Sequence, residues 1–229
     1  MSKSKSIYVE FIGPAGVGKS TLYKEVLSRV EKRLGECKVV KNEDIKSSFV
    51  YLIKNPTYTT KAIFYSTIIS FHKIEKRMKS FRKLMKRSVS LNNKLYKNIV
   101  FLDEGPVNKI LTEINRSRNE RMSKYYYNYL ELVFLKNNKN LFFVFLDASP
   151  ETIARRILVR PKKGLGIEKK SYNEIIATYK NAKRKDNKKG LQKFLKKYNA
   201  QCVDLINEEG CIEGNATKII NILKINELI

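Results

Sequence analysis

Apolar residues gather along the chain into five short runs, each about as long as a β-strand. The runs lie at residues 7–12, 37–41, 99–102, 141–146 and 201–206. All but the first are mostly continuous rather than alternating, which is typical of strands buried on both faces of a parallel sheet. The pattern therefore predicts five parallel strands.

Between these runs, apolar residues recur at steps of three and four, which is the spacing of amphipathic helices. This spacing predicts a long apolar stripe at residues 64–89 and helices over residues 21–34, 107–135, 150–159, 171–183 and 215–223. Strands and helices thus alternate, and no internal repeat or linker rich in Pro, Gly or Ser separates them. We predict a single α/β domain over residues 1–229, with right-handed crossovers between the strands.

Two segments are longer than such a fold requires. Residues 45–96 form an insertion between the second and third strands, and the apolar stripe within it has helical spacing. Residues 155–170 form a basic lid region, in which a loop that contains glycine joins two helices. Long segments at fixed points of a rigid sheet are where binding and lid functions usually lie.

The chain carries 47 Lys and Arg residues against 22 Asp and Glu residues, a formal charge of +25. This excess predicts attraction to polyanions such as nucleotides, nucleic acid or acidic lipid headgroups. The three cysteines and the single histidine, His72, lack the spacing of a zinc site, and so few cysteines favour a reducing cytosol. No signal peptide pattern and no apolar stretch of the ~20 residues that span a bilayer are found, so we expect a cytoplasmic protein without a membrane span.

Residues 13–20 read GPAGVGKS and match the P-loop pattern G-x-x-x-x-G-K-[ST] between a predicted strand and a predicted helix. Glycines allow successive backbone N–H groups to turn inward around a phosphate. Lys19, expected to be exposed, supplies a charge to the β- and γ-phosphates, and the Ser20 hydroxyl is placed to coordinate Mg²⁺. The residues predicted to bind the nucleotide are Gly13, Pro14, Ala15, Gly16, Val17, Gly18, Lys19, Ser20 and Thr21.

Two carboxylates, Asp103 and Glu104, follow the third predicted strand. Ligands of open parallel sheets bind beyond the carboxyl ends of the strands. We expect Asp103 to hold Mg²⁺ through water, and either carboxylate can take the proton of an attacking hydroxyl. Asp147 ends the fourth strand in a similar way, but Ser149 and Pro150 after it are typical of a helix start, so we assign Asp147 a structural role.

Basic residues crowd the start of the lid region: Arg155, Arg156, Arg160, Lys162 and Lys163. Planar guanidinium groups suit the dispersed charge of a phosphoryl group in transfer, and a mobile loop can exclude water. Arg156 and Arg160 are one helical turn apart, so both can face the same phosphate, and we favour these two as catalytic residues. A solvated face is the alternative interpretation of such a charge run.

With these motifs, the chain resembles the P-loop nucleoside and nucleotide kinases, most of all the thymidylate kinase-like group. The likeness also rests on FLDASPETIARRILVR at residues 145–160 and VDLIN at residues 203–207, and it runs from residue 7 to about residue 223. It implies a P-loop NTPase-type three-layer α/β fold with a five-stranded parallel sheet, a helical insertion on the acceptor side and a basic lid. It also implies Mg·ATP as the donor and a small-molecule acceptor. The catalytic candidates are then Lys19, Asp103, Glu104, Arg156 and Arg160.

One position departs from that group. Thymidylate and deoxynucleoside kinases usually place an Arg directly after the carboxylate of the third strand, and here the residue is Glu104. A monophosphate acceptor needs cationic neighbours, for which Arg116, Arg118 or a residue of the insertion over residues 45–96 would have to substitute. A hydroxyl acceptor instead benefits from a carboxylate base. We therefore expect an uncharged hydroxyl acceptor to be at least as well suited as a monophosphate.

Other functions are compatible with the sequence. The charge of +25 and the thirteen tyrosines leave open a nucleic-acid 5′-hydroxyl kinase or a nucleic-acid-stimulated ATPase. A nucleotide switch at a membrane surface would need a guanine-reading motif after a strand, which the chain lacks. The sequence also leaves homodimer formation open.

Overall fold

The computed structural model of the chain describes residues 7–34, 39–40, 99–116, 120–133, 135, 140–160, 167 and 169–225. The predicted insertion over residues 45–96, together with His72, lies outside the described residues. The same holds for Arg118 and for Lys162 and Lys163 of the lid region.

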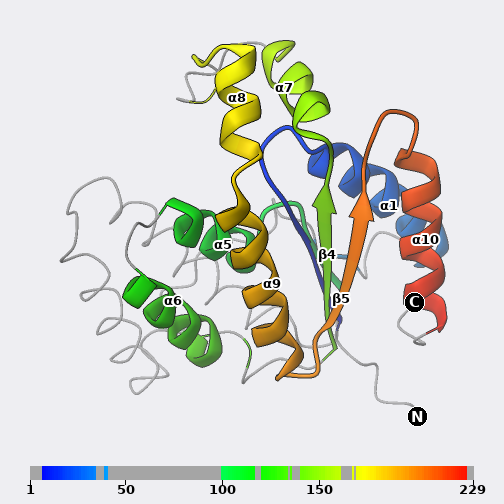
Figure 1. Cartoon of the computed structure of the whole chain (residues 1–229). Coiled ribbons are helices and arrows are strands. Elements are labelled where there is room, and N and C mark those ends of the chain that lie inside the picture. The colour runs from blue at the N-terminus through cyan, green and yellow to red at the C-terminus, as the bar shows by residue number, and fades with distance from the viewer. Residues whose placement is uncertain are drawn as a thin grey trace.

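A parallel sheet in the strand order β2-β3-β1-β4-β5 forms the centre of the fold (Figure 1). Its strands are β1 (Ile7–Ile12), β2 (Val39–Val40), β3 (Ile99–Leu102), β4 (Leu141–Asp147) and β5 (Gln201–Ile206). The predicted run at residues 37–41 is described only at the two residues of β2, so four strands of four to seven residues make up nearly all of the sheet. The predicted α/β class with a parallel sheet is confirmed.

Burial explains why the strands appeared as continuous apolar runs. Every residue of β1 and β3, and every residue of β4 except the last, is buried. These strands are covered on both faces, which removes the alternation of polar and apolar positions. The edge strand β5 pairs only with β4, and its Gln201, Asp204 and Ile206 are exposed.

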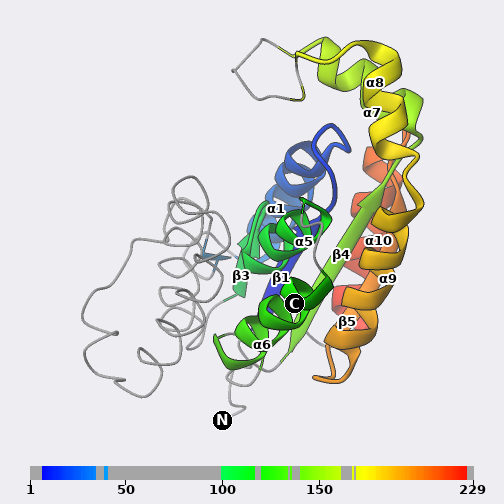
Figure 2. The same cartoon turned by 60° about the vertical axis from the view of Figure 1, so that its left-hand side comes forward.

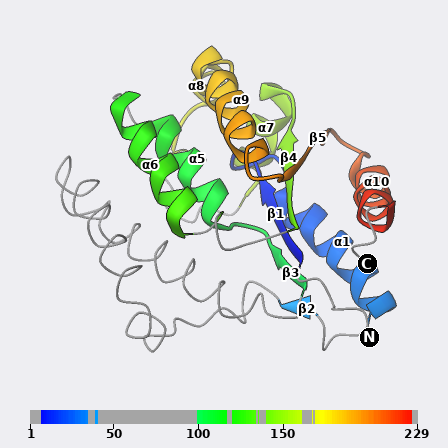
Figure 3. The same ribbon diagram turned by 90° about the horizontal axis from the view of Figure 1, so that it is seen from below.

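Helices cover the two faces of the sheet (Figures 2 and 3). α1 (Lys19–Leu34) and α10 (Ile212–Ile225) pack on one face, and their apolar residues form one core with Val9, Phe11 and Phe142. α5 (Pro106–Arg116), α6 (Glu120–Val133) and α9 (Ala182–Lys196) pack on the other face, around Tyr8 and Phe143. The predicted three-layer arrangement is thus present in the described residues.

The two remaining described helices, α7 (Pro150–Leu158) and α8 (Tyr172–Tyr179), lie at the carboxyl ends of β4 and β5 (Figure 1). The Ser149 side chain caps α7 by accepting a hydrogen bond from the Thr152 N–H, and Pro150 is the first residue of the helix. This geometry confirms the predicted helix start after Asp147.

Two helix predictions are wrong in their extent. Residues 107–135 form two helices, α5 and α6, because one helix of that length would measure roughly 43 Å, about twice a strand of this sheet. Residues 171–183 are also divided, between α8 and the start of α9, and the continuation of α9 to Lys196 was not predicted. The sequence of α9 is mostly charged, and among its described side chains Leu191, Phe194 and Leu195 pack against the core.

Among the residues that the structure describes, none of the helices has both the length and the apolar composition needed to cross a membrane.

Candidate active site

The P-loop (residues 13–20) joins the central strand β1 to α1, as the motif predicts. The Val17 N–H donates to the Pro14 carbonyl over 3.4 Å, and the Leu22 N–H donates to the Gly18 carbonyl over 3.1 Å where α1 begins. Backbone N–H groups at the start of a helix attract anions, since no carbonyl within the helix accepts them.

Two P-loop glycines are required by shape. Gly16 and Gly18 have φ angles of +86° and +90°, a region that other L-residues rarely adopt. A Cβ atom on Gly18 would lie 2.5 Å from Nδ2 of Asn207, and one on Gly16 would lie 2.8 Å from a side-chain carbon of Ile157. The loop therefore packs directly against α7 and against the segment after β5.

Lys19 is only 7% exposed, so the expectation of an exposed lysine is wrong. Its side chain turns back beneath the loop from the first residue of α1. The Nζ atom donates to the carbonyl oxygens of Gly13 and Pro14, at 2.9 and 3.0 Å. The ammonium group thus stabilises the loop in its present shape.

The charges around Lys19 bring the predicted catalytic residues together. Burial lowers the pKa of Lys19 from its ordinary value. The carboxylates of Glu104 and Asp103 oppose this shift in the pKa, and the Arg160 guanidinium adds to it. Three of the predicted catalytic residues, Asp103, Glu104 and Arg160, therefore act electrostatically on the fourth, Lys19.

The Asp103 carboxylate is half-buried, and its Oδ1 atom is buried without a hydrogen-bond partner among the described residues. A buried oxygen of this kind fits a role as a ligand of a hard cation, directly or through water. Ser20, the other predicted ligand, is exposed on the first turn of α1. The described residues contain no group of three or more His, Cys, Asp or Glu side chains that would hold a metal ion. A Mg²⁺ ion would thus take most of its oxygens from phosphates and water, as this ion usually does.

A buried carboxylate that no sequence motif includes lies directly beneath this acidic end. Glu10 in β1 is fully buried and accepts hydrogen bonds from the Tyr8 hydroxyl and from the N–H groups of Val107 and Asn108, at 3.3 and 2.6 Å for the last two. Burial raises the pKa of Glu10 to about 7, although these hydrogen bonds oppose the shift. The signal in the sequence was a single carboxylate in the middle of an apolar strand.

Arg156 contacts the P-loop backbone. Its Nη1 donates to the Asn207 carbonyl at 2.8 Å and to the Val17 carbonyl at 3.3 Å. Nδ2 of the buried Asn207 donates to the same Val17 oxygen at 2.8 Å. Arg160, exposed just beyond the end of α7, is the arginine that acts on Lys19. Contact of either arginine with a phosphoryl group stays a prediction.

A pocket of about 610 Å³ opens beside this contact. The P-loop, α7 and the segment after β5 enclose it, and its lining includes Gly18, Thr21, Arg156, Arg160, Asn207 and Ile212. Pockets of this size are typical of small-molecule sites.

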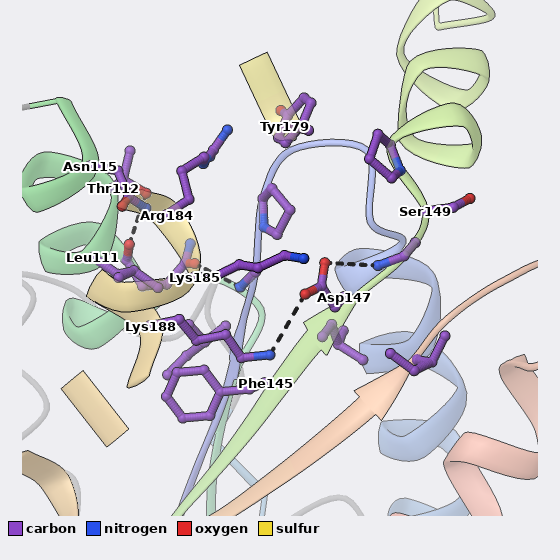
Figure 4. A pocket seen from close by; sticks show the side chains of 18 of the residues that line it. Leu111, Thr112, Asn115, Phe145, Asp147, Ser149, Tyr179, Arg184, Lys185 and Lys188 are labelled. Atoms are coloured by element: carbon purple, nitrogen blue, oxygen red, sulfur yellow. Dashed lines mark hydrogen bonds and ion pairs between the residues drawn. The ribbon is translucent and has the colours of Figure 1, made fainter. Parts of the chain in front are cut away.

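A second pocket, of about 400 Å³, lies between β4, α5 and the α8–α9 corner (Figure 4). Several cations line it, but carboxylates already engage two of them. The Lys188 ammonium lies 2.7 Å from Asp204 and 3.8 Å from Asp147, and Lys180 lies 3.1 Å from Glu151. The pocket is therefore less cationic than its lysines suggest.

The corner between α8 and α9 reaches the tip of the P-loop. The Tyr179 hydroxyl donates to the Ala15 carbonyl at 3.3 Å, and the Arg184 guanidinium lies over the Tyr179 ring at 4.5 Å. The segment that follows the lid region thus contacts the loop that precedes α1.

No protein-family model matches this chain, and no curated protein matches it by sequence. Solved structures match its shape. Deoxyadenosine kinase from M. mycoides with bound dATP superposes with a TM-score of 0.53 at 17% identity, over 95% of this chain and 99% of that chain. The same enzyme with bound dCTP gives a TM-score of 0.50 at 19% identity, with the same coverage. The chain has the fold of the P-loop nucleoside and nucleotide kinases.

The predicted resemblance is therefore confirmed at the level of the fold. Its finer part, the thymidylate kinase-like group, stays a prediction. Thymidylate kinase from Ehrlichia chaffeensis superposes with a TM-score of 0.48 at 13% identity, over 96% of this chain and 98% of that chain.

Proposed function

We propose that this protein is a phosphotransferase that moves the γ-phosphoryl group of Mg·ATP to a hydroxyl group of a small, nucleoside-like acceptor. The observation that carries the proposal is the position of Lys19, which touches the P-loop carbonyls and is influenced by the Asp103 and Glu104 carboxylates. A cation between a phosphate cradle and two carboxylates suits phosphoryl transfer, which depends on positioning and on charge stabilisation.

On the donor side, the P-loop N–H groups and Lys19 would hold the phosphates. The pocket of about 610 Å³ beside Asn207 and Ile212 would hold the base and the sugar of the nucleotide. Ser20 and Asp103 would hold Mg²⁺, which when bound neutralises charge on the phosphates. The orphan Oδ1 atom of Asp103 supports this assignment.

On the acceptor side, a carboxylate would take the proton from the acceptor hydroxyl. The acceptor oxygen then bonds to the γ-phosphorus, the bond to the β–γ bridging oxygen breaks, and ADP leaves. Glu104 after Asp103 favours a hydroxyl over a monophosphate, since a carboxylate repels an acceptor that is already anionic. The fold shared with deoxyadenosine kinase is consistent with this choice.

The acceptor assay tests the proposal. ATP consumption is measured with nucleosides, nucleoside monophosphates, other small alcohols and a 5′-hydroxyl oligonucleotide, for the wild type, Asp103→Asn and Glu104→Gln. We expect turnover with a nucleoside or a small alcohol, and a loss of roughly 10²-fold or more in kcat for the variant that lacks the base. Glu213→Gln, an exposed carboxylate on α10, is the matched control and should retain full turnover.

Transfer to dTMP that is undiminished in Glu104→Gln would contradict the hydroxyl acceptor and support the thymidylate kinase-like alternative. Transfer to the oligonucleotide alone would instead support the nucleic-acid 5′-hydroxyl kinase.

A further inference from the structure

Asn108, in the first turn of α5, makes two hydrogen bonds that join separate parts of the fold. Its backbone N–H donates to Oε1 of Glu10 at 2.6 Å. Its side-chain Oδ1 accepts a hydrogen bond from the N–H of Gly13, the first P-loop residue, at 3.1 Å. Asn108 is only 6% exposed and its bond to Glu10 is buried, so water competes little with that bond.

Glu10 holds the other end of this bridge. Its carboxylate accepts from the N–H groups of Val107 and Asn108 at the start of α5, where unpaired N–H groups attract a negative charge. A Cβ atom on Gly105 would collide with the Glu10 carboxyl carbon and would lie 2.5 Å from the Tyr8 hydroxyl oxygen. The carboxylate therefore fills the space directly beneath the turn that follows Asp103 and Glu104.

The strand register places Glu10 beside the turn that contains Asp103 and Glu104. Glu10 pairs with Leu102, the last residue of β3, so the turn leaves the sheet beside the Glu10 side chain. The first turn of α5 returns to the same carboxylate. Asp103 and Glu104 are thus fixed on both sides by contacts to β1, and Asn108 extends the connection to the P-loop.

Burying the Glu10 carboxylate inside an apolar strand costs desolvation free energy, which suggests that the carboxylate has a specific role there. Every other residue of β1 is apolar or aromatic, and an apolar side chain at position 10 would pack without a desolvation penalty. A buried carboxylate that binds the α5 N–H groups instead fixes one geometry of the turn.

We propose that Glu10 and Asn108 are positioning residues, which hold the turn of Asp103 and Glu104 at a fixed distance from the P-loop so that the carboxylates face the phosphates held by Lys19. This inference rests on the proposed kinase function. Neither residue is required to touch the substrate.

The proposal predicts a specific division between binding and turnover. Without the Asn108 oxygen, the P-loop keeps its glycines, Lys19 and the contact at Val17, so nucleotide binding should change little. The carboxylates lose their fixed place relative to the reacting phosphate, and a displacement of about 1 Å can lower the rate roughly 10²-fold.

The test compares Asn108→Leu, which removes the acceptor oxygen, with Asn108→Asp, which retains one. We expect kcat to fall about 30- to 100-fold in Asn108→Leu, with the Kd of Mg-free ATP within about 3-fold of the wild type. Asn108→Asp should recover most of the loss. Glu10→Gln replaces one carboxylate oxygen by a donor and should lower kcat about 10-fold. Ile220→Val, a buried change on α10, controls for a loss of stability and should lower Tm alone.

A second readout does not require an acceptor. The gain in ATP affinity that Mg²⁺ provides should shrink at least several-fold in Asn108→Leu, because Asp103 no longer meets the phosphates in the same place. An Asn108→Leu variant that behaves like Ile220→Val, or that loses Mg-free ATP binding as strongly as turnover, would overturn the positioning role. A wild type that neither binds ATP nor transfers its phosphate would contradict the proposed function itself, and the two failures are therefore distinguishable.

Discussion

Two of the anchors that hold the P-loop, one at Gly13 and one at Val17, differ in kind. At its start, the N–H of Gly13 donates to Asn108, which is tied to the buried Glu10. At its middle, the Val17 carbonyl accepts hydrogen bonds from Asn207 and Arg156 beside an open pocket. The first anchor continues through Asn108 to the buried Glu10, beneath the turn of Asp103 and Glu104, whereas the second lines the pocket of about 610 Å³.

The P-loop has two tasks, the alignment of the reacting groups and the binding of the nucleotide, and the two anchors serve them differently. A buried hydrogen bond exchanges little with water and fixes a distance, which is what the alignment of reacting groups requires. The half-buried Arg156, which donates to the carbonyls of Val17 and Asn207, lines the pocket and can adjust to a ligand. We therefore expect the first anchor to control turnover and the second to control nucleotide affinity.

The largest effect is expected at Lys19, whose ammonium group donates to the carbonyl oxygens of Gly13 and Pro14. Lys19→Met keeps much of the apolar stem but removes the charge, and kcat should fall on the order of 10³-fold or more. Because the side chain is buried and the carbonyls of Gly13 and Pro14 lose their donor, Tm should also fall by several degrees. Lys24→Met, exposed on α1, is the matched control, and equal kinetics in both variants would contradict the role of Lys19.

Glu10, at the end of the first anchor, should also make the stability of the protein depend on pH. Burial raises the pKa of Glu10 from 4.5 to about 7, so between these values the folded protein retains a proton that the unfolded chain has lost. The associated stability is present below pH 4.5 and is lost as the pH rises through about 7, by roughly 3 kcal/mol. Glu10→Gln has no such group, so its free energy of unfolding should improve relative to the wild type from pH 5 to pH 8. Urea denaturation of both proteins measures this, and a constant difference would count against the shifted pKa.

For the second anchor we expect a smaller effect, on ATP affinity rather than on turnover. Arg156→Ala removes one hydrogen bond to the P-loop carbonyl of Val17 and one to the carbonyl of Asn207, and it should raise the KM for ATP about 10-fold, with kcat changed much less. Steady-state kinetics at saturating acceptor measure this division. A larger loss in kcat than in ATP affinity would instead support direct contact of Arg156 with the phosphoryl group, as the spacing of Arg156 and Arg160 suggested.

The sequence predicted the parts of the fold that depend on local pattern. The P-loop came from its motif, the four strands β1, β3, β4 and β5 from their apolar runs, and the start of α7 from Ser149 and Pro150. Local pattern failed for α9, whose few apolar residues do not mark a helix. It also could not reveal the anchors, because their partners are distant along the chain: Asn108 is 95 residues from Gly13, and Asn207 is 190 residues from Val17.

The smallest effect is expected at Arg155, the neighbour of Arg156 on the same helix. Its guanidinium meets Glu209 at 3.3 Å, and both side chains are more than half exposed. Exposed ion pairs contribute little, since water screens the charges and two long side chains lose freedom, so Arg155→Ala should change the free energy of unfolding by at most about 0.5 kcal/mol. The KM for ATP should stay within about 2-fold of the wild type, because no P-loop atom loses a partner. Chemical denaturation and steady-state kinetics on Arg155→Ala and Arg156→Ala, prepared side by side, give the comparison. If both variants weaken ATP affinity equally, nucleotide binding depends on the positive charge of the surface rather than on the hydrogen bonds of Arg156 in the second anchor.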